Sequence, residues 1–396
     1  MNFKQQLTDM YRILTLNNIS PLGLVRFPNE NYQVSDKETA PDAIMLRSYK
    51  MHDFQIPESL KAVGRAGAGV NNIPVDKLSD IGIPVFNAPG ANANAVKELV
   101  VAGLLLACRN LCEAWDYTRK LNGSDVQLAR AVEEGKKRFA GFELPGKVMG
   151  VVGLGAIGRS VANICIELGM KVVGYDPMLT VEGAWKLSSN VERANTIELL
   201  LSKSDFVTFH VPLTDTTRNM INAANIGSVK TGASIMNFAR DGVVDDVAIC
   251  KAINEGLLKA YVTDFPNNKT KGCQGVIALP HLGASTQEAE DNCAVMVADQ
   301  LREFLENGNI RNSVNFPEVM LQRGSPHRLI VANANVPNML GQISTAMAEA
   351  NLNIHDMINQ SRGDIAYTVV DTDSPISEAI RKKVRAIDGV MMARVL

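Results

Sequence analysis

The feature that most constrains this chain is a regular alternation of short apolar runs with helix-like segments between residues 147 and 290. The runs are KVMGVVGL, KVVGYD, FVTFHV, SIMNFA, AYVTDF and GVIALP. Apolar runs of this length, separated by segments of helical period, are typical of βαβ units, in which strands are buried on both faces of a parallel sheet. The pattern predicts an α/β fold with a doubly wound, Rossmann-like domain in the middle of the chain.

Two further units flank this central one. Upstream, AIMLRS, KAVGRAGAG and GIPVFNAP predict shorter strands of a second α/β unit, and a helical stretch over residues 94–121 leads into the centre. Downstream, a helix over 287–306 ends at the stop signal NGN. After a linker at 316–327, the order of patterns over 328–396 is βαββαβ, which is that of a small, separate ferredoxin-like domain. Its first helix is expected to bury Met339, Leu340, Ile343 and Met347.

Composition narrows the classes of function. At 396 residues the chain is too long for one core, and its net charge of −2 argues against nucleic acid or an anionic membrane as partner. The six cysteines show no clustering with each other or with histidine, so neither a metal site nor a disulfide framework is expected, and a reducing cytoplasm fits. The first 14 residues lack the apolar core of a signal peptide. The longest apolar run, 99–108, is too short to span a bilayer.

The most specific local motif is GVVGLGAIGRS at 150–160. Its Gly153, Gly155 and Gly158 form G-x-G-x-x-G after a strand and before a helix, the arrangement that brings a pyrophosphate to a helix N-terminus. Asp176 ends the next strand, 18 residues after Gly158. A carboxylate there accepts ribose hydroxyls and repels a 2′-phosphate, so NAD is favoured over NADP. The plainer reading of Asp176 is a surface residue before a turn proline, and its pairing with the glycines outweighs that reading.

Two stretches at later strand ends carry groups suited to hydride-transfer chemistry. In NFARDGVVDD, Arg240 can hold a carboxylate with two hydrogen bonds and polarise a neighbouring carbonyl, although an ion pair with Asp241 or Asp245 is the plainer reading. In ALPHLGAST, His281 can exchange a proton with a hydroxyl. A lone histidine is more often a satisfied core or loop residue. Here the carboxyl ends of parallel strands bring His281, Arg240 and the glycine motif to one sheet edge, which favours a catalytic site.

At this point the chain resembles the D-isomer-specific 2-hydroxyacid dehydrogenases, most of all those phosphoglycerate dehydrogenases that carry a C-terminal ACT domain. The resemblance rests on GRAGAGVNNIPVD, FNAPGANANAVKEL, GLGAIG, FHVPLTDTTRNMI, NFARDGVVDD, VTDF and PHLGASTQEA, which cover nearly the whole chain in family order. It implies two Rossmann-like doubly wound domains, a substrate-binding lid domain of residues 1–93 with 286–320 and an NAD-binding domain of 94–285, followed by an ACT regulatory domain of 325–396.

The resemblance also implies a role for each matching residue. Arg240 would bind and polarise the substrate, His281 would be the acid/base and Asp264 would hold the nicotinamide carboxamide. The rest of the NAD pocket would comprise Gly153, Gly155, Ala156, Ile157, Gly158, Asp176, Pro212, Thr217, Phe238, Ala239, Gly283 and Ala284. Arg47, Lys50 and Arg65 would be candidates for the substrate phosphate.

The chain departs from the family where most members have a glutamate that hydrogen-bonds the catalytic histidine. The segment DFPNNKTKGCQGVIALPH at 264–281 contains no Glu, and no Asp after Asp264. Three alternatives remain open: Asp264 orients the imidazole, Asn268 does so without charge, or the family glutamate is dispensable here.

The expected activity is NAD-dependent oxidation of 3-phosphoglycerate to 3-phosphohydroxypyruvate, the first step of L-serine biosynthesis. The alternatives are a glyoxylate or hydroxypyruvate reductase of the same family and a non-catalytic NAD-sensing protein. By resemblance the chain would form a homodimer through the nucleotide domain or a homotetramer through the C-terminal domains. L-serine would be an effector that binds between two such domains at Asn333, Asn335 and Asn353.

Overall fold

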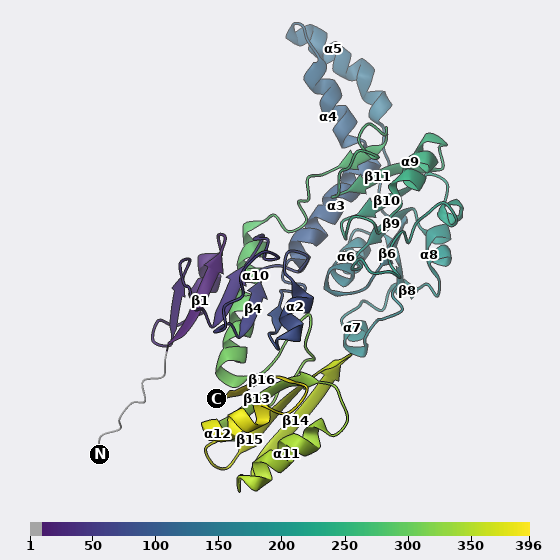
Figure 1. The fold of residues 1–396 in the computed structure, drawn as a ribbon. Coiled ribbons are helices and arrows are strands. Elements are labelled where there is room, and N and C mark those ends of the chain that lie inside the picture. Colours follow the sequence, from purple (N-terminus) through teal and green to yellow (C-terminus); the bar gives the residue numbers. More distant parts are fainter. Residues whose placement is uncertain (1–9) are drawn as a thin grey trace. The chain divides into compact units, whose positions relative to one another are not determined.

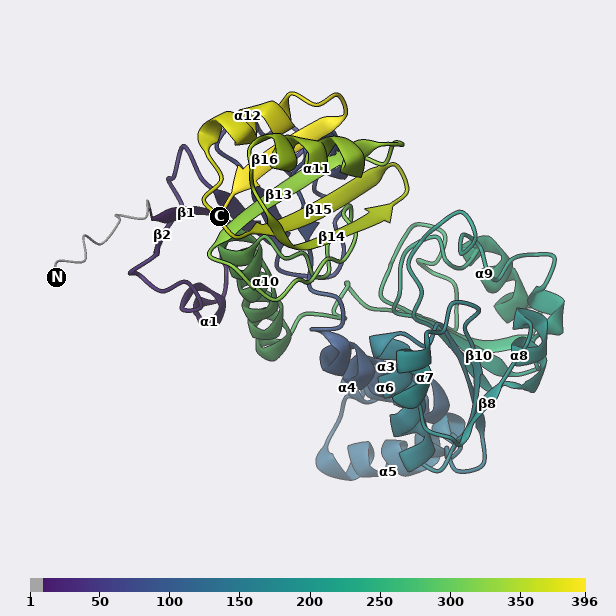
Figure 2. The same cartoon turned by 90° about the horizontal axis from the view of Figure 1, so that it is seen from below.

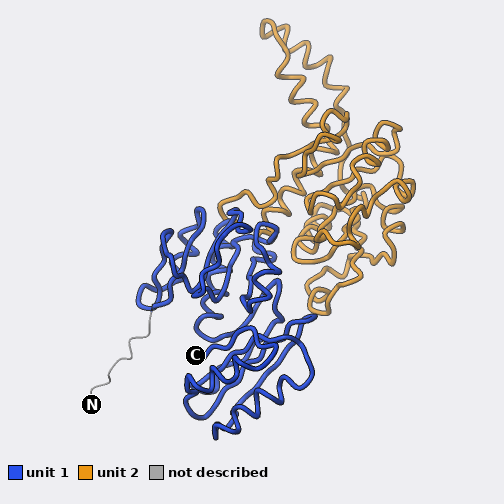
Figure 3. The backbone as a smooth tube through the Cα atoms, viewed as in Figure 1, with its two compact units in different colours: residues 1–91, 290–396 blue, residues 92–289 orange. Residues whose placement is uncertain are grey.

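The computed structural model describes residues 10–396, so most of the segment judged to lack a signal peptide lies outside the described part. The chain divides into two compact units, one of Met1–Ala91 with Glu290–Leu396 and one of Asn92–Ala289 (Figure 3). Within residues 10–396, no helix combines the length and apolar character that crossing a membrane requires. The same residues contain no group of three or more His, Cys, Asp or Glu side chains arranged for a metal ion.

The first unit contains a parallel five-stranded sheet of order β2-β1-β3-β4-β5 (Figure 1). Its strands are β1 (Tyr11–Leu16), β2 (Tyr32–Ser35), β3 (Ala43–Leu46), β4 (Ala62–Arg65) and β5 (Val85–Phe86), with short helices α1 (Pro21–Leu24) and α2 (Val75–Asp80). The long helix α10 (Gln287–Asn307) packs on this sheet. Gly64 is required for that packing, because a Cβ there would lie 2.4 Å from Val297 and 2.9 Å from Leu301 of α10.

The second unit is a parallel seven-stranded sheet of order β12-β11-β10-β9-β6-β7-β8. Its strands are β6 (Val148–Val152), β7 (Lys171–Tyr175), β8 (Val191–Arg193), β9 (Phe206–Phe209), β10 (Ala233–Asn237), β11 (Leu258–Thr263) and β12 (Val276–Ala278). The order reverses between β6 and β9, which is the doubly wound, Rossmann-type topology. The fold predicted for the centre of the chain is therefore confirmed.

Helices cover both faces of that sheet. They are α3 (Ala93–Arg109), α6 (Ala156–Glu167), α7 (Val181–Trp185), α8 (Ile197–Lys203) and α9 (Asp246–Asn254), with a 3₁₀ turn η2 at Ile226–Ser228. The helix expected over 94–121 is broken at Asn110, whose φ of 52° is left-handed, and continues as α4 (Leu111–Lys120). A further helix, α5 (Asp125–Gly135), and the 3₁₀ turn η1 (Lys136–Phe139) follow. Helices α4 and α5 form a hairpin that projects from the unit (Figure 1).

The C-terminal part of the first unit is an antiparallel sheet of order β14-β15-β13-β16. Its elements are β13 (His327–Ala334), α11 (Met339–Glu349), β14 (Ile354–Arg362), β15 (Ile365–Thr372), α12 (Glu378–Arg385) and β16 (Val390–Val395). This βαββαβ order and strand arrangement confirm the ferredoxin-like prediction. Both helices lie on one face of the sheet (Figure 2).

The two faces of the C-terminal sheet are both buried. One packs under α11, where Met339, Ile343 and Met347 enter the core as predicted, whereas Leu340 is 41% exposed, contrary to the prediction. The other face contributes Ile330, Ala332, Tyr367 and Val369 to the hydrophobic cluster that contains α10 and the N-terminal sheet. The C-terminal sheet and the N-terminal sheet therefore share a core within one compact unit, and the division into three domains stays a prediction.

Candidate active site

Six loops at the carboxyl edge of the seven-stranded sheet carry the residues that the sequence singled out. Backbone hydrogen bonds tie each loop to its neighbour. Gly153 N–H donates to Tyr175 O (2.9 Å), His210 N–H to Val152 O (2.8 Å), Asp264 N–H to Asn237 O (3.1 Å) and Leu279 N–H to Thr263 O (2.8 Å). Because parallel strands present their carboxyl ends on one side, these loops together form the edge at which open α/β sheets bind ligands.

The glycine loop between β6 and α6 shows why two of its three glycines are needed. Gly153 has a φ of +86°, and a Cβ there would lie 2.6 Å from the His210 carbonyl oxygen. At Gly158 a Cβ would lie 1.8 Å from the carbonyl oxygen of Gly153. At Gly155, the N-cap of α6, a Cβ would meet nothing within 4 Å. Two glycines thus close the turn, and the third leaves open space at the start of α6, a helix N-terminus whose free N–H groups are of the kind that can bind an anion.

Asp176 lies directly after β7 and connects two backbone segments. One carboxylate oxygen accepts from Leu154 N–H of the glycine loop (2.8 Å) and the other from Met178 N–H (2.9 Å). Each oxygen keeps a further lone pair, so the carboxylate can still accept hydroxyl donors. The side chain is half-buried rather than a free surface group. These contacts fit a ribose-binding acid.

The loop after β9 is held by its own hydroxyl groups. Thr217 donates to the Pro212 carbonyl (2.5 Å) and accepts from Thr214 N–H (2.8 Å). Beside it, His210 is half-buried, and desolvation of its ring lowers its pKa to about 3. Its Nε2 lies 3.0 Å from Thr208 Oγ1, while its Nδ1 is buried with no hydrogen-bond partner. His210 is therefore neutral near pH 7 and is not an acid/base candidate.

The loop after β10 is shaped by Asn237, a buried residue that the sequence analysis did not single out. Its amide nitrogen donates to Arg240 O (3.0 Å), and its amide oxygen accepts from Ala239 N–H (3.1 Å). This bracket fixes the backbone of Phe238, Ala239 and Arg240. An asparagine at the end of an apolar strand and before a turn is the sequence signal for a side chain that hydrogen-bonds the backbone of the following loop.

Arg240 makes no ion pair with any described carboxylate. Asp245 instead caps α9 by accepting hydrogen bonds from Val247 N–H and Ala248 N–H. The simpler interpretation of Arg240, an ion pair with Asp241 or Asp245, is therefore not what the structure shows. The Arg240 guanidinium donates only to the Ala239 carbonyl (2.6 Å). Desolvation lowers the pKa of Arg240, although the residue reaches solvent and an arginine stays charged at neutral pH. An unpaired guanidinium at this edge can receive a carboxylate.

Asp264, at the end of β11, is 1% exposed and gives both carboxylate oxygens to the loop that follows β12. They accept from Leu282 N–H (2.7 Å) and Gly283 N–H (2.8 Å). A Cβ on Gly283 would lie 3.2 Å from the same carboxylate, which explains the small residue. Asp264 therefore orients the backbone that carries His281, Gly283 and Ala284, and does not contact the imidazole.

His281 has a left-handed backbone, with φ of +58°, which is uncommon for a residue other than glycine. Its exposed ring meets Phe265 edge to face, with ring centroids 5.0 Å apart. Among the described residues no side chain hydrogen-bonds the imidazole, and Asn268 is exposed and does not reach it. Of the three alternatives for the missing family glutamate, neither Asp264 nor Asn268 contacts the ring in this structure.

The basic candidates for a phosphate lie in the first unit, at the carboxyl ends of β3 and β4. Leu46 pairs with Arg65 in the parallel register, and Arg65 Nε–H donates to the Arg47 carbonyl (3.1 Å). Arg47 forms an ion pair with Glu290 (2.6 Å). Lys50 is exposed. Two guanidinium groups and one ammonium therefore share one edge of the N-terminal sheet.

The three asparagines proposed for an effector are not neighbours within one chain. Asn333 pairs with Ala366 at the start of β15, whereas Asn353 donates to Asp373 (2.6 Å) beyond its end. Asn335 donates to the Gly363 carbonyl (3.0 Å), on the same side as Asn333. Asn333 Oδ1 is buried without a hydrogen-bond donor. A site that uses all three residues therefore needs two copies of the domain.

Comparisons with known proteins agree with this geometry. Residues 101–283 match the model of the D-isomer specific 2-hydroxyacid dehydrogenase NAD-binding domain. The D-3-phosphoglycerate dehydrogenase of Haemophilus influenzae is 35% identical over 85% of this chain and 81% of its own. A putative D-3-phosphoglycerate dehydrogenase of Schizosaccharomyces pombe is 30% identical over 97% of this chain and 88% of its own.

Solved structures share the fold of this chain. The 3-phosphoglycerate dehydrogenase of Entamoeba histolytica with bound NAD⁺ has a TM-score of 0.59 at 25% identity. The match covers 77% of this chain and 99% of that one. The NADPH-dependent glyoxylate/hydroxypyruvate reductase of Sinorhizobium meliloti shares the fold, with a TM-score of 0.63 at 21% identity over 79% and 99% of the two chains. The predicted cofactor class, NAD, agrees with the matched domain. The chain belongs to the D-isomer specific 2-hydroxyacid dehydrogenase family.

Proposed function

We propose that this chain oxidises 3-phosphoglycerate to 3-phosphohydroxypyruvate with NAD, the first step of L-serine biosynthesis. The observation that carries the proposal is the unpaired guanidinium of Arg240 after β10, on the same sheet edge as His281 after β12 and the open glycine loop after β6. These are an anion receptor, a proton acceptor and a dinucleotide cradle on neighbouring loops. The choice of a phosphorylated substrate rests on the relatives, which are named D-3-phosphoglycerate dehydrogenases.

In this proposal each side chain has one task. Arg240 holds the substrate carboxylate and polarises the oxygen at the carbon that is oxidised, and His281 takes the hydroxyl proton. NAD, when bound, accepts the hydride. Asp264 fixes the loop of His281 through Leu282 and Gly283, so the histidine is positioned by its backbone. The family glutamate is then dispensable here, which is the third of the alternatives that the sequence left open.

The lid role of residues 1–93 with 286–320, the nucleotide role of 94–285 and the ACT role of 325–396 belong to the same proposal. Arg47, Lys50 and Arg65 would hold the phosphate, since bidentate guanidinium groups and an ammonium suit a phosphate. The site residues Ala156, Ile157, Pro212, Thr217, Phe238, Ala239 and Ala284 would line the NAD pocket. The support is their place on the loops at the carboxyl edge.

For assembly we propose a homodimer through the nucleotide unit, with a tetramer through the C-terminal domains. The α4–α5 hairpin supports the first contact, because its only buried residue is Gly135 and it exposes Leu111, Trp115, Val126 and Val132. Strand β14 supports the second, since it is an unpaired edge of its sheet. A cytoplasmic location fits the six free cysteines.

The test is an enzyme assay that follows the loss of NADH absorbance as NADH is oxidised. The oxidant is 3-phosphohydroxypyruvate, hydroxypyruvate or glyoxylate. The proposal expects kcat/KM to be highest by at least about a hundredfold for the phosphorylated substrate, because the phosphate adds several charge-assisted hydrogen bonds. Equal or better use of glyoxylate or hydroxypyruvate would identify a reductase of the same family. NADH binding without reduction of any of the three would identify an NAD sensor.

A further inference from the structure

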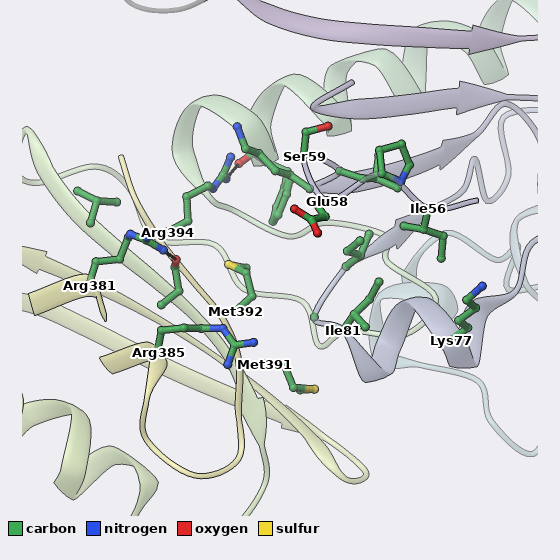
Figure 4. Close-up of a pocket in the computed structure, with 18 of the residues that line it drawn as sticks. Ile56, Glu58, Ser59, Lys77, Ile81, Arg381, Arg385, Met391, Met392 and Arg394 are labelled. Carbon is green, nitrogen blue, oxygen red and sulfur yellow. Dashed lines mark hydrogen bonds between the residues drawn. The ribbon is translucent and has the colours of Figure 1, made fainter. Parts of the chain in front are cut away.

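A cavity of about 880 Å³ lies within the first unit, and none of the candidate active-site residues lines it (Figure 4). One wall is formed by the loop at residues 56–61 and by α2 with the turn after it. The other wall is formed by α12 and β16 of the C-terminal sheet. The volume is in the range of cavities that bind small molecules. A molecule bound there would touch both the N-terminal and the C-terminal part of the unit.

The cavity lining is strongly basic. It contains five cations, Lys61, Lys77, Arg381, Arg385 and Arg394, against two carboxylates, Glu58 and Glu378. Two of the cations are neutralised by partners: Lys61 pairs with Asp42 (2.6 Å), and Arg381 pairs with Glu378 through two hydrogen bonds, one of 2.7 Å.

Three cations therefore remain without an ion pair among the described residues. Lys77 has no described carboxylate partner, and Arg385 donates only to the Val390 carbonyl. Both residues line the cavity and are exposed. Against these three cations stands only Glu58, so the lining keeps a surplus of two positive charges.

Arg394 is the most informative of the three. Its two terminal nitrogens donate to the carbonyls of Phe304 (2.6 Å) and Leu305 (3.3 Å), and its Nε is buried without an acceptor. Its guanidinium also stacks over the Phe304 ring, 4.7 Å from the centroid. Burial lowers the pKa of Arg394. This half-buried cation bonds only to neutral carbonyls and forms no ion pair with a described carboxylate, so it raises the positive potential of the cavity wall.

Apart from Ser59, the remaining side chains of the lining are apolar. Ile56, Ile81 and Ile83 come from the N-terminal side, and Met391 and Met392 from β16 (Figure 4). A site that combines a surplus of two positive charges with apolar walls is complementary to a small organic dianion. We propose that this cavity binds a small organic molecule with two negative charges, a phosphate monoester or a dicarboxylate, at a site distinct from the one that carries the dehydrogenase reaction. This proposal does not depend on which hydroxyacid the enzyme oxidises.

The test uses phenyl phosphate and phthalate as probes, which present a phosphate monoester or two carboxylates on the same apolar ring. Binding to the full chain is measured by calorimetry at low ionic strength, with phenol as the neutral probe. At least one dianion should bind and phenol should not. The double variant Lys77→Met with Arg385→Met should weaken that binding by about a hundredfold, about tenfold for each lost charge-assisted contact.

Three controls make the result specific. Lys382→Met removes an exposed cation of α12 that does not line the cavity, so it should leave the affinity within about twofold. Arg240→Met should also leave it unchanged, which separates this site from the reaction site. The thermal midpoint of the double variant should match that of wild type, since both residues are exposed. Failure of both dianions to bind wild type, or equal binding by the double variant, would overturn the proposal.

Discussion

At the scale of single residues, the candidate site is built by residues that position backbone as much as by residues that face the substrate. Asn237 brackets the loop of Arg240, and Asp264 holds Leu282 and Gly283 beyond His281. The left-handed backbone of His281 is a strained conformation, which persists only where neighbouring contacts hold it. Asp264, a buried polar side chain directly after β11, supplies such contacts on the two residues that follow His281.

The first prediction concerns the two reactive side chains. Arg240→Lys keeps a charge but loses the two-pronged guanidinium, and His281→Asn loses the proton acceptor. Each should lower kcat by roughly 10²–10⁴-fold, while the affinity for NADH, followed by its fluorescence, changes by less than about threefold. Arg193→Lys, on the exposed strand β8, is the matched control. A near-normal kcat in either site variant would show that its role is assigned wrongly.

The second prediction concerns Asp176 and the choice of cofactor. Asp176→Asn removes the charge yet keeps an amide oxygen for Leu154 N–H or Met178 N–H, so the loop should survive. Without repulsion of the 2′-phosphate, the ratio of kcat/KM for NADP to that for NAD should rise by on the order of tenfold. Steady-state assays with both cofactors measure it. Equal use of NADP and NAD by wild type would contradict the assignment.

The third prediction is a pH dependence of stability that comes from His210. Burial lowers its pKa to about 3 in the folded chain, against a usual value of 6.5. Between about pH 6.5 and 3, His210 is therefore protonated in the unfolded chain but not in the folded chain. The stability is complete above pH 6.5 and is lost as pH falls towards 3, by up to about 1.4 kcal/mol per pH unit. Urea unfolding of wild type and His210→Gln between pH 7 and 4 should show a shallower slope for the variant, and parallel slopes would refute this.

At the scale of helices and strands, burial decides what the sequence reveals. The strands of the seven-stranded sheet were predicted because buried parallel strands are nearly all apolar, as in β9 and β10. Strand β8, with sequence VER, was missed because it is an exposed edge. Strands β1 and β2 were missed as well; each leaves residues partly exposed. Helix α5 escaped because it carries almost no buried residue.

The same reasoning applies to the candidate site. That Arg240, Asp264 and His281 follow successive strands could be predicted, because parallel strands place their ends on one edge. The contact of Asp264 with the backbone of residues 282 and 283, rather than with the imidazole, could not be predicted from the sequence. It depends on the path of the loop after β12. The left-handed backbone at His281 and the burial of His210 are likewise consequences of tertiary structure.

The fourth prediction tests how β13 and β15 are joined to the end of α10. Arg328 and Asp371 are both fully buried and form two hydrogen bonds, of 2.6 and 2.8 Å, and Arg328 also donates to the Asn307 and Leu321 carbonyls. Burial alone would raise the pKa of Asp371, but the bonds from Arg328 lower it overall. Arg328→Met should lower the free energy of unfolding by about 3–5 kcal/mol, because it leaves the buried carboxylate of Asp371 without its positive partner.

The control for that experiment is the double variant Arg328→Met with Asp371→Leu. It removes both charges, so it should recover a large part of the loss in the same urea titration. A double variant as unstable as Arg328→Met would show that the carbonyl bonds of Arg328, and not its ion pair, hold this junction together.

At the scale of the whole molecule, the C-terminal sheet is joined to the N-terminal sheet by a common core. Its face with Ile330, Tyr367 and Val369 packs into the cluster that contains Phe304 of α10. Tyr367 also donates a buried hydrogen bond to the Gly308 carbonyl (2.7 Å). A change at the C-terminal sheet can therefore reach the N-terminal sheet through packed side chains. Deleting the C-terminal residues would expose this core, so regulation is better tested with point variants.

The fifth prediction is that L-serine regulates the enzyme through a site shared by two chains. Asn335 and Asn353 lie beyond opposite ends of β15, so each site would take Asn335 from one chain and Asn353 from the other. Both are exposed, and Asn335→Ala and Asn353→Ala should each abolish serine binding measured by calorimetry without unfolding the chain. In wild type, serine and NADH should alter each other's affinity by the same factor.

Mixing the two variants gives the decisive measurement. In a mixed pair, one site would lack both asparagines and the other would keep both. Random reassembly of an equal mixture of the two variants, neither of which binds serine alone, should therefore restore one serine site in each mixed pair, or about one for every four chains. A site built within a single chain would stay defective in every mixed pair, because each chain still lacks one of its asparagines. Serine inhibition that survives in both single variants would place the effector site elsewhere. Complementation by mixing would show that the regulatory site exists only in the assembled enzyme, because the fold holds its two halves apart within each chain.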